Sequence, residues 1–477
     1  MVSQKRIGKV THHPLAIAYV LSLVVCWLPV PLIGYVVPPL CLCVYTLVAR
    51  DGLPIKRYVL LTSLAFAIAL AWAATQDYFL FQNAVIAYIT YNMWICLMCL
   101  VAARDFSVRD LQLVENSVFW MILVQALVGI AQAAYGSTQT GTFDSGNGDY
   151  VRGTLSLSLV PIAGFTNPTY GANLAFLLLA GLRYIMVSRR PVNKWRASVL
   201  ALGTISLVLA SVVHILGFLV VALLLAWLVM LPKKQILTNI AVLSGVGVLV
   251  LFIYNVLNQN VTGIPAFAQT FLEKTPRGQL IQRLFTAIPE EYPLMPWVGL
   301  GPGQFCSRAG LIAGGVFFGG PRDRTQQLPL LNPELSDPLN KYQLDLWYSS
   351  VGTAYDGSNY RPFSSWISFY SEFGLLGVVV LGVFIARIIA RARRWGSTRE
   401  GAAMAFVFAS GVGLMFFLGF QENYWEVPQA LFPGGLYLCI LYRHASLTAK
   451  RPPRLHLQPV GRRMAEVRVR QLQPART

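Results

Sequence analysis

Runs of about twenty apolar residues recur along almost the whole chain, and they restrict its possible folds more than any other feature. We count twelve hydrophobic segments, most of them long enough for a helix that crosses a bilayer. Hydrophobic residues make up 55% and charged residues 12% of the 477 positions, whereas a soluble domain is about 25% charged. The sequence therefore predicts an all-α, polytopic integral membrane bundle. The predicted segments are 14–29, 31–49, 58–74, 80–102, 112–135, 163–185, 197–212, 214–231, 235–257, 364–386, 401–420 and 426–442.

The apolar segments divide the chain into four parts. Nine predicted transmembrane helices occupy 1–257, a large loop occupies 258–363, three more transmembrane helices occupy 364–442, and a basic tail follows at 443–477. The loop is too long for a simple connection. Its stretch "PRGQLIQRLFTAIPEEY" has apolar residues at helical spacing, so we expect a partly helical loop that lies on the membrane surface or against the bundle.

Basic residues predict the orientation, because Lys and Arg collect in cytoplasmic loops near helix ends. They occur at the N-terminus, in alternate gaps between the apolar segments and in the tail, whereas 258–363 carries eight basic and eight acidic residues. The net charge of +18 therefore belongs to one side. We predict that this side is cytoplasmic and holds both termini, that the loop lies outside, and that the tail is attracted to anionic lipid rather than to nucleic acid.

The polar stretch "EEYPLMPWVGLGPGQF" begins at Glu290 and contains Gly299, Gly301 and Gly303. A nucleotide-binding loop would need a preceding strand and a following Lys-Ser/Thr pair, and the sequence has neither. The glycines then either let the backbone approach a ligand closely or only redirect the chain. Trp297 and other aromatic residues nearby suit a membrane interface or stacking on sugar rings.

Three segments resemble motifs of the O-antigen ligase/O-antigen polymerase family of bacterial envelope glycan assembly. They are "IPEEYPLMPWVGLGPGQF" at 288–305, "SSWISFYSEFGLLG" at 364–377 and "AGFTNPTYGANLA" at 163–175. Their order and the long loop before the tenth predicted span also agree with the family. The resemblance implies a GT-C-like fold and a metal-independent glycosyltransferase of the bacterial inner membrane. Its active site would be periplasmic, and it would act in O-antigen, exopolysaccharide or lipopolysaccharide biosynthesis.

The sequence departs from the ligase pattern at three positions. Phe363 stands where ligases carry a His, His214 where a middle helix carries an Arg, and Pro161 where an Arg precedes the Gly-Phe-x-Asn-Pro segment. These departures favour a polymerase, which would join undecaprenyl-diphosphate-linked oligosaccharide repeats. A ligase that transfers the glycan to lipid A-core is the alternative. A polytopic transporter of an anionic substrate is a second alternative and a scaffold protein a third.

Glycan transfer from such a carrier leaves negative charge on the departing diphosphate, which arginines stabilise through paired hydrogen bonds. We predict Arg277 and Arg283 as diphosphate ligands, followed by Arg152 and Arg361. Surface ion pairs, with Glu290 as one available partner, are the alternative role for these arginines.

A base must also assist the acceptor hydroxyl. His214 is the one histidine that we expect near the outer face, and Glu290 and Glu372 are the other candidates, although His214 can equally be a hydrogen-bonded turn residue. Candidate glycan contacts are Asn167, which we consider a better helix cap, and Trp297, Gly301 and Gly303.

No carboxylate cluster with metal-ligand spacing stands out in the sequence, so we predict neither a metal nor another cofactor. The predicted partners are the undecaprenyl-diphosphate-linked glycan, the lipid bilayer, a flippase and a chain-length regulator. We expect no nucleic acid.

Overall fold

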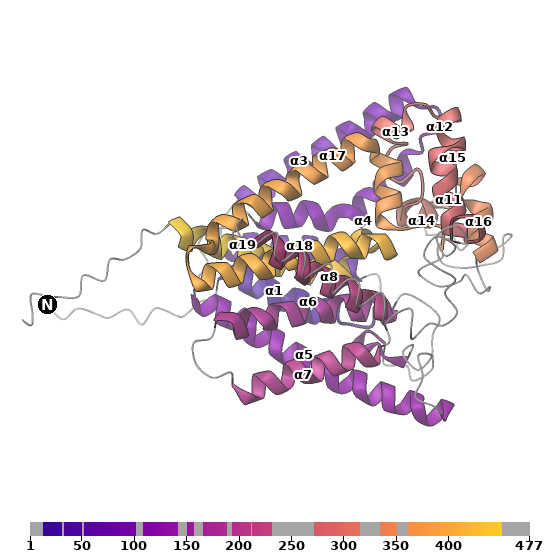
Figure 1. Ribbon diagram of the computed structural model, residues 1–477. Coiled ribbons are helices and arrows are strands. Elements are labelled where there is room, and N and C mark those ends of the chain that lie inside the picture. The colour runs from indigo at the N-terminus through magenta and orange to yellow at the C-terminus, as the bar shows by residue number, and fades with distance from the viewer. Residues whose placement is uncertain are drawn as a thin grey trace, which may run out of the picture.

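The computed structural model describes residues 13–30, 33–49, 52–101, 108–141, 150–156, 166–187, 193–210, 212–230, 271–314, 334–350 and 361–450. All regular structure in these ranges is helical, and they contain no strand. Long helices lie alongside one another in a bundle, and several short helices gather at one end of it (Figure 1). We call these short helices the cap, and the two ends of the bundle the cap end and the far end.

Eleven of the predicted segments coincide with long helices of the bundle, and the predicted segment 235–257 lies outside the described residues. Among the described residues, six helices are long and apolar enough to cross a membrane, namely α3, α4, most of α5, α6, α17 and α18. Shorter apolar helices are α1, α2 and α8. The all-α prediction is therefore confirmed for the described residues, while the count of twelve spans and the GT-C fold remain predictions. The long helices are α1 (Pro14–Cys26), α2 (Ile33–Ala49), α3 (Leu53–Thr75), α4 (Phe81–Leu100), α5 (Val108–Thr140), α6 (Thr166–Val187), α7 (Lys194–Leu209), α8 (Val213–Met230), α17 (Ser365–Arg393), α18 (Arg399–Gln421) and α19 (Pro428–Lys450).

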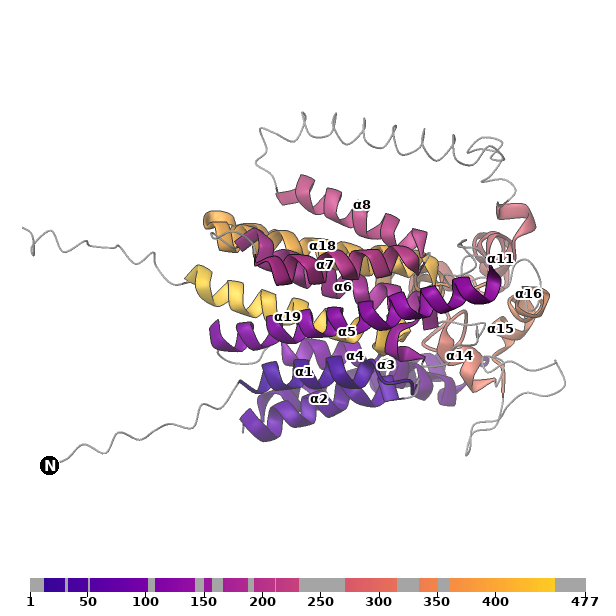
Figure 2. The same cartoon turned by 90° about the horizontal axis from the view of Figure 1, so that it is seen from below.

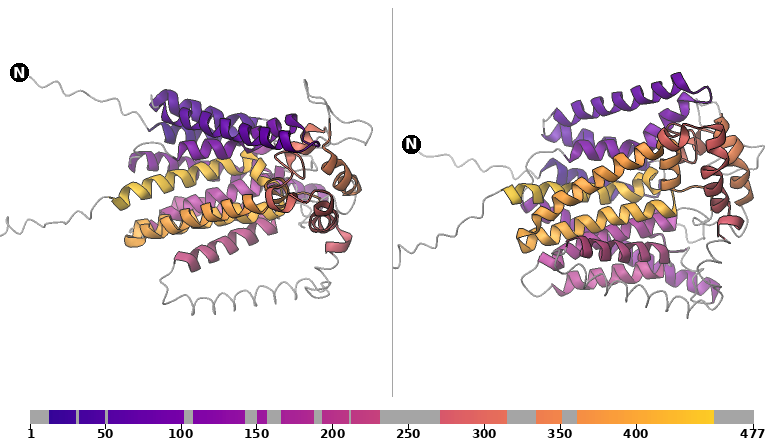
Figure 3. Two further views of the ribbon diagram at one scale, coloured as in Figure 1. Left: turned by 90° about the horizontal axis from the view of Figure 1, so that it is seen from above. Right: turned by 45° about the horizontal axis from the view of Figure 1, so that its top comes forward.

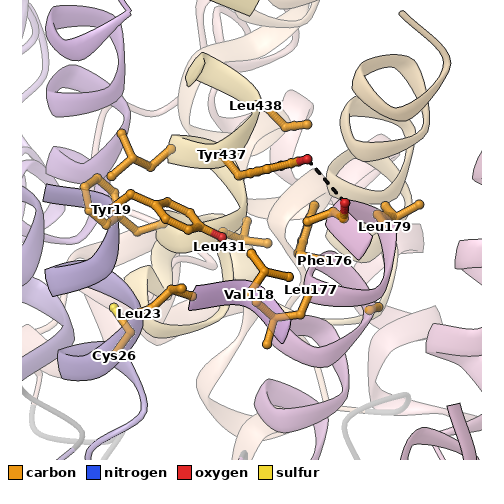
Figure 4. Close-up of a cluster of buried hydrophobic side chains, with 14 of the residues drawn as sticks. Tyr19, Leu23, Cys26, Val118, Phe176, Leu177, Leu179, Leu431, Tyr437 and Leu438 are labelled. Atoms are coloured by element: carbon orange, nitrogen blue, oxygen red, sulfur yellow. Dashed lines mark hydrogen bonds between the residues drawn. The ribbon is translucent and has the colours of Figure 1, made fainter. Parts of the chain in front are cut away.

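The bundle is packed around α6, α18 and α19. Figure 2 shows α1 and α2 on one side of these helices and α8 on the other, and both views in Figure 3 keep the cap at one end. At the centre, Tyr19 of α1 and Tyr437 of α19 pack with Phe176 and Leu177 of α6 (Figure 4). The Tyr437 hydroxyl donates to the carbonyl oxygen of Ala180 at 3.4 Å. This bond gives the phenol a partner in an apolar interior, where an unpaired hydroxyl is costly.

Two long helices lie at the edge of the bundle. Only 6% of the membrane-crossing window of α3 and of α17 is buried, compared with 67% for α6 and for α18. Most side chains of α3 and α17 are therefore available to lipid.

The cap forms its own small core. The predicted apolar spacing is confirmed for Leu280, Leu284 and Ile288, which are buried in this core, whereas Phe285 is exposed. The predicted helix is nevertheless divided in two at Thr286, where φ is −121° and ψ is −84°. The cap helices are α11 (Pro276–Phe285), α12 (Ala287–Glu291), α13 (Met295–Val298), α14 (Arg308–Ala313), α15 (Asp337–Tyr342) and α16 (Leu344–Ser350).

Candidate functional site

The cap joins the bundle at an interruption in α17. Gly374 has φ 62° and ψ −167°, so the helix is broken there, and α17 changes direction beside α13 (Figure 1). The carbonyl oxygens of Ser371 and Glu372, just before the break, accept hydrogen bonds from the backbone N–H groups of Leu300 and Gly301 at 2.8 and 3.0 Å. The glycine loop of the cap therefore supplies donors to a broken helix, which keeps buried backbone groups paired.

The three loop glycines all have positive φ, at 81° for Gly299, 97° for Gly301 and 75° for Gly303. A Cβ atom on Gly299 would lie 2.2 Å from the carbonyl oxygen of Glu372, and one on Gly303 would lie 2.3 Å from that of Asn83 in α4. These distances require glycine, because the loop backbone packs directly on the backbones of two helices. Gly301 and Gly303 are buried, and their predicted role in glycan binding remains a prediction.

Beneath the glycine loop, polar side chains from the start of α14, from α17 and from the segment after α18 are buried together. Each is at most 7% exposed. A buried charge is unfavourable unless it is paired or hydrogen-bonded, so such a group is either a structural network or a site. We call it the junction cluster, and its members are Ser307, Arg308, Ser368, Glu372, Glu422, Asn423 and Glu426.

The turn at Cys306 holds this cluster in place. Cys306 has φ 61° and is the one non-glycine residue with positive φ in the described ranges. Its N–H donates to the Gln343 side chain at 3.0 Å, and its carbonyl oxygen accepts from the hydroxyl of Ser368 at 2.6 Å and the amide of Asn423 at 3.1 Å. Such backbone strain persists only where surrounding bonds hold it, and it is frequent at functional sites.

Two carboxyl groups of the cluster follow the end of α18. Glu426 accepts from the backbone N–H groups of Arg308 and Ala309 at 3.1 and 3.2 Å and from the Thr90 hydroxyl at 3.3 Å. Burial raises its pKa to about 7, and those amides together with the Arg308 charge oppose the shift.

Glu422 has a different environment. Burial raises its pKa to about 7, although Arg308, Arg361 and Arg277 all lower it. In the described part of the chain, its Oε1 atom has no hydrogen-bond partner. A carboxyl group that titrates near neutral pH and keeps an unoccupied oxygen has the properties of a general base.

Glu372, a predicted catalytic residue, is fully buried about two turns into α17. Its carboxylate faces the Ser307 hydroxyl and the backbone N–H groups of Gly303 and Phe305. Neither of its oxygens forms a hydrogen bond of normal geometry with the described residues. Glu372 therefore faces the underside of the glycine loop.

Arg277, a predicted diphosphate ligand, is 5% exposed. Its guanidinium donates to the carbonyl oxygens of Arg361 at 3.0 Å, Phe363 at 2.8 Å and Phe420 at 3.4 Å. Burial lowers its pKa to about 10, and the Glu422 charge opposes this shift. Arg277 thus ties α11 to the start of α17 and the end of α18, which makes it a positioning residue of the junction cluster.

The other predicted arginines lie in three separate places. Arg361 is half-buried beside the cluster, with its guanidinium 5.6 Å from the centre of the Trp347 ring. Arg283 lies on the cap and forms two 2.8 Å hydrogen bonds to Asp345. Arg152 is 1% exposed and packs against α5, where its backbone N–H donates to the Gln132 side chain at 2.8 Å. The structure therefore brings Arg277 and Arg361 to the cluster, and not Arg283 or Arg152.

The remaining predicted residues are also dispersed. His214 at the start of α8 contacts the side chain of Gln421, the residue before Glu422. Glu290 is exposed on α12, and Trp297 on α13 is 62% exposed. Asn167 donates to the carbonyl oxygen of Ala210 at 3.1 Å, which ties α6 to α7.

The sequence-based prediction missed Arg308, Glu422, Asn423 and Glu426. A signal for Glu422, Asn423 and Glu426 exists in "QENYWE", where two glutamates stand at the boundary of the predicted segments 401–420 and 426–442. Ionisable residues at the boundary of a span are functional candidates.

The sequence matches no protein-family model, and no curated protein is significantly similar to it. Within the described ranges, His, Cys, Asp and Glu side chains form no group of three that could hold a metal ion. The junction cluster combines arginine and carboxylate groups with serine and asparagine side chains.

Proposed function

We propose that the protein transfers an oligosaccharide from an undecaprenyl-diphosphate-linked donor to a sugar hydroxyl at the junction cluster. One observation carries this proposal. Glu422, a carboxyl group whose pKa is raised to about 7, is surrounded by the charges of Arg277, Arg308 and Arg361 where the cap meets the bundle. The reaction needs both kinds of group in one place, a base for the acceptor and cations for the departing diphosphate.

In the proposed step, the acceptor oxygen attacks the anomeric carbon of the donor, and the bond between that carbon and the phosphate oxygen breaks. The electron pair leaves with the diphosphate, and the acceptor proton passes to Glu422. Arg361 is the cation best placed for the diphosphate, because it is half-exposed at the edge of the cluster. Glu422 is 1% exposed, so the acceptor reaches it only when the cap moves away from α18.

The geometry favours Glu422 over the three bases suggested by the sequence. Glu290 is exposed on the cap surface, and the His214 ring contacts Gln421. Glu372 faces the backbone of the glycine loop. In contrast to Glu426, whose oxygens are engaged by two backbone amides and a hydroxyl, Glu422 keeps one oxygen available.

The position of the break in α17 supports an enzyme rather than a transporter. Residues 375–393 extend roughly 28 Å, which is close to the thickness of the hydrocarbon core. The break at Gly374 therefore lies near one membrane surface, whereas transporters interrupt their helices near the midplane. We propose that this surface is the periplasmic face of the bacterial inner membrane.

The purified protein in detergent provides the decisive experiment. It is incubated with an undecaprenyl-diphosphate-linked repeat, with and without lipid A-core, and the products are sized. Longer carrier-linked chains are expected and indicate a polymerase, while labelled core indicates a ligase. No product, together with substrate uptake into vesicles, would overturn the enzyme proposal in favour of a transporter.

Variants test the assignment of the base. Glu422→Gln is expected to lower the rate roughly 100-fold or more, because it removes the proton acceptor. The wild-type rate should rise with pH, with an apparent pKa of about 7, and then reach a plateau. This pH-dependent rise should be absent in Glu422→Gln. Lys341→Ala is the control, since Lys341 lies on the cap surface with Glu291 and should leave the rate unchanged. Full activity of Glu422→Gln would exclude the assignment.

A further inference from the structure

Three large apolar side chains of the cap are exposed beside the break in α17. Phe285 is 64%, Leu294 57% and Trp297 62% exposed. Phe285 stacks on Tyr370 with ring centres 5.5 Å apart. The backbone of Trp297 lies against Gly374, where a Cβ atom would be 2.4 Å from its carbonyl carbon. Positions 370 and 374 are one helical turn apart, so both contacts fall on the same turn of α17.

This surface continues directly into the exposed face of α17. Beyond the break, exposed apolar residues recur at a spacing that keeps them on one side of a helix long enough to cross a membrane. They are Leu375, Leu376, Val379, Val380, Val383 and Phe384, each between 44% and 61% exposed. The cap residues therefore extend the exposed apolar surface of α17.

We propose that Phe285, Leu294 and Trp297 insert into the bilayer at the cap end, between headgroups and acyl chains, and anchor the cap to the membrane that α17 crosses. Tryptophan favours this boundary, and interfacial helices bury their apolar face roughly 5–10 Å into it. Glu290 is exposed on the adjoining α12, and Glu291 pairs with Lys341 there, which gives the anchor a polar border.

The chemistry of the anchor points to acyl chains rather than charged headgroups. Arg283, two residues before Phe285, is already engaged by both carboxylate oxygens of Asp345. Insertion of the anchor side chains into the bilayer should therefore depend little on salt concentration or on the charge of the lipid headgroups. This inference does not depend on the proposed glycosyltransferase activity.

Quenching of tryptophan fluorescence tests the anchor in the full-length protein. The protein is placed in phosphatidylcholine vesicles with bromine atoms on the acyl chains, and the emission of Trp297 is obtained as the difference between wild type and Trp297→Phe. We expect the brominated lipids to remove most of this emission and aqueous acrylamide to remove little. The emission of Trp347, which is 4% exposed in the cap core, is obtained in the same way from Trp347→Phe and should resist both quenchers.

A transplanted tryptophan keeps the test informative if Trp297→Phe disturbs the fold. Leu294→Trp in the Trp297→Phe background is expected to restore lipid-quenchable emission, because both positions belong to the anchor. Lys341→Trp, on the polar side of the cap at a 52% exposed side chain, should instead be quenched by acrylamide. Emission from Trp297 and from Leu294→Trp that is quenched by acrylamide and not by brominated lipid would overturn the anchor. If a carrier-linked oligosaccharide protects Trp297 from acrylamide, the anchor role is wrong and Trp297 stacks on a sugar ring.

Discussion

At the scale of single residues, Arg277, a predicted diphosphate ligand, also organises the junction cluster. Its guanidinium donates to the carbonyl oxygens of Arg361, Phe363 and Phe420, which belong to two different segments of the bundle. The planar fork of an arginine suits several acceptors at once, whereas lysine is a single point charge. The residue predicted as a diphosphate ligand therefore positions Arg361 and Glu422.

Arg277→Ala is expected to lower the free energy of unfolding by roughly 3 kcal/mol, because it leaves buried carbonyls without their donor and removes a positive charge near Glu422. Arg283→Ala is the matched comparison, since it removes a partly exposed ion pair with Asp345 and should change stability by about 0.5 kcal/mol. Denaturant unfolding in detergent measures both changes. Equal effects of the two variants would contradict the positioning role.

Glu422 gives the stability of the protein a defined pH dependence. Its pKa is raised to about 7 in the folded protein, whereas a glutamate in an unfolded chain titrates near 4.3. Between these values the folded state retains a proton that the unfolded state has released. Stability should therefore decrease as the pH rises from about 4.3 to 7 and then stay level.

Glu422→Gln removes this group, so its melting temperature should change less than that of wild type between about pH 5 and about pH 7.5. The residual change would come from Glu426, whose pKa is also raised by burial. Substitution of the exposed Glu290 by Gln is the control and should keep the wild-type slope. The same slope in wild type and Glu422→Gln would show that Glu422 does not hold a proton in the folded state.

At the scale of elements, α17 and the glycine loop depend on each other. The loop amides of Leu300 and Gly301 are donors for carbonyls next to the break in α17, and Gly374 leaves room for the backbone of Trp297. The apolar pattern predicted a helix in this place, but it contained no sign of the break. An isolated glycine is tolerated in many helices, so the interruption depends on donors more than sixty residues earlier in the chain.

Two glycines of α17 provide a direct comparison. Gly374→Ala is expected to destabilise the protein by roughly 2 kcal/mol or more, because alanine at positive φ is strained and its Cβ would meet α13. Gly382→Ala, in the same helix, has no atom within 4 Å of the added Cβ and should be neutral or slightly stabilising. Thermal unfolding in detergent distinguishes the variants. A neutral Gly374→Ala would mean that the break is not required.

At the scale of the whole molecule, the two ends of the bundle carry different polar groups, and the buried ion pair of Arg183 and Glu115 lies at the far end. The cap and the junction cluster lie at the cap end, whereas α3 and α17 leave most of their surface to lipid. A site at one membrane surface suits a reaction between a lipid-linked donor and a polar acceptor. Both substrates can then meet without crossing the bilayer.

The predicted orientation can be checked with reporter fusions. Alkaline phosphatase fused after Tyr292 in the cap should be active, because the cap is predicted to lie outside. Green fluorescent protein fused after Gly396, in the basic segment at the far end, should be fluorescent, because that end is predicted to be cytoplasmic. The reversed pattern would contradict the orientation and remove the periplasmic site from the proposed function.

The all-helical architecture and the helical parts of the cap followed from apolar runs and from the spacing of residues such as Leu280 and Leu284, because the periodicity of burial is a local property of the chain. The identity of the site did not follow in the same way. Glu422 and Glu426 come close to Arg308 only when the segment after α18 packs under the start of α14, more than a hundred residues earlier in sequence. Likewise, neither the positioning role of Arg277 nor the exposure of Trp297 can be derived from neighbours in sequence, since both depend on which surfaces the long-range packing covers.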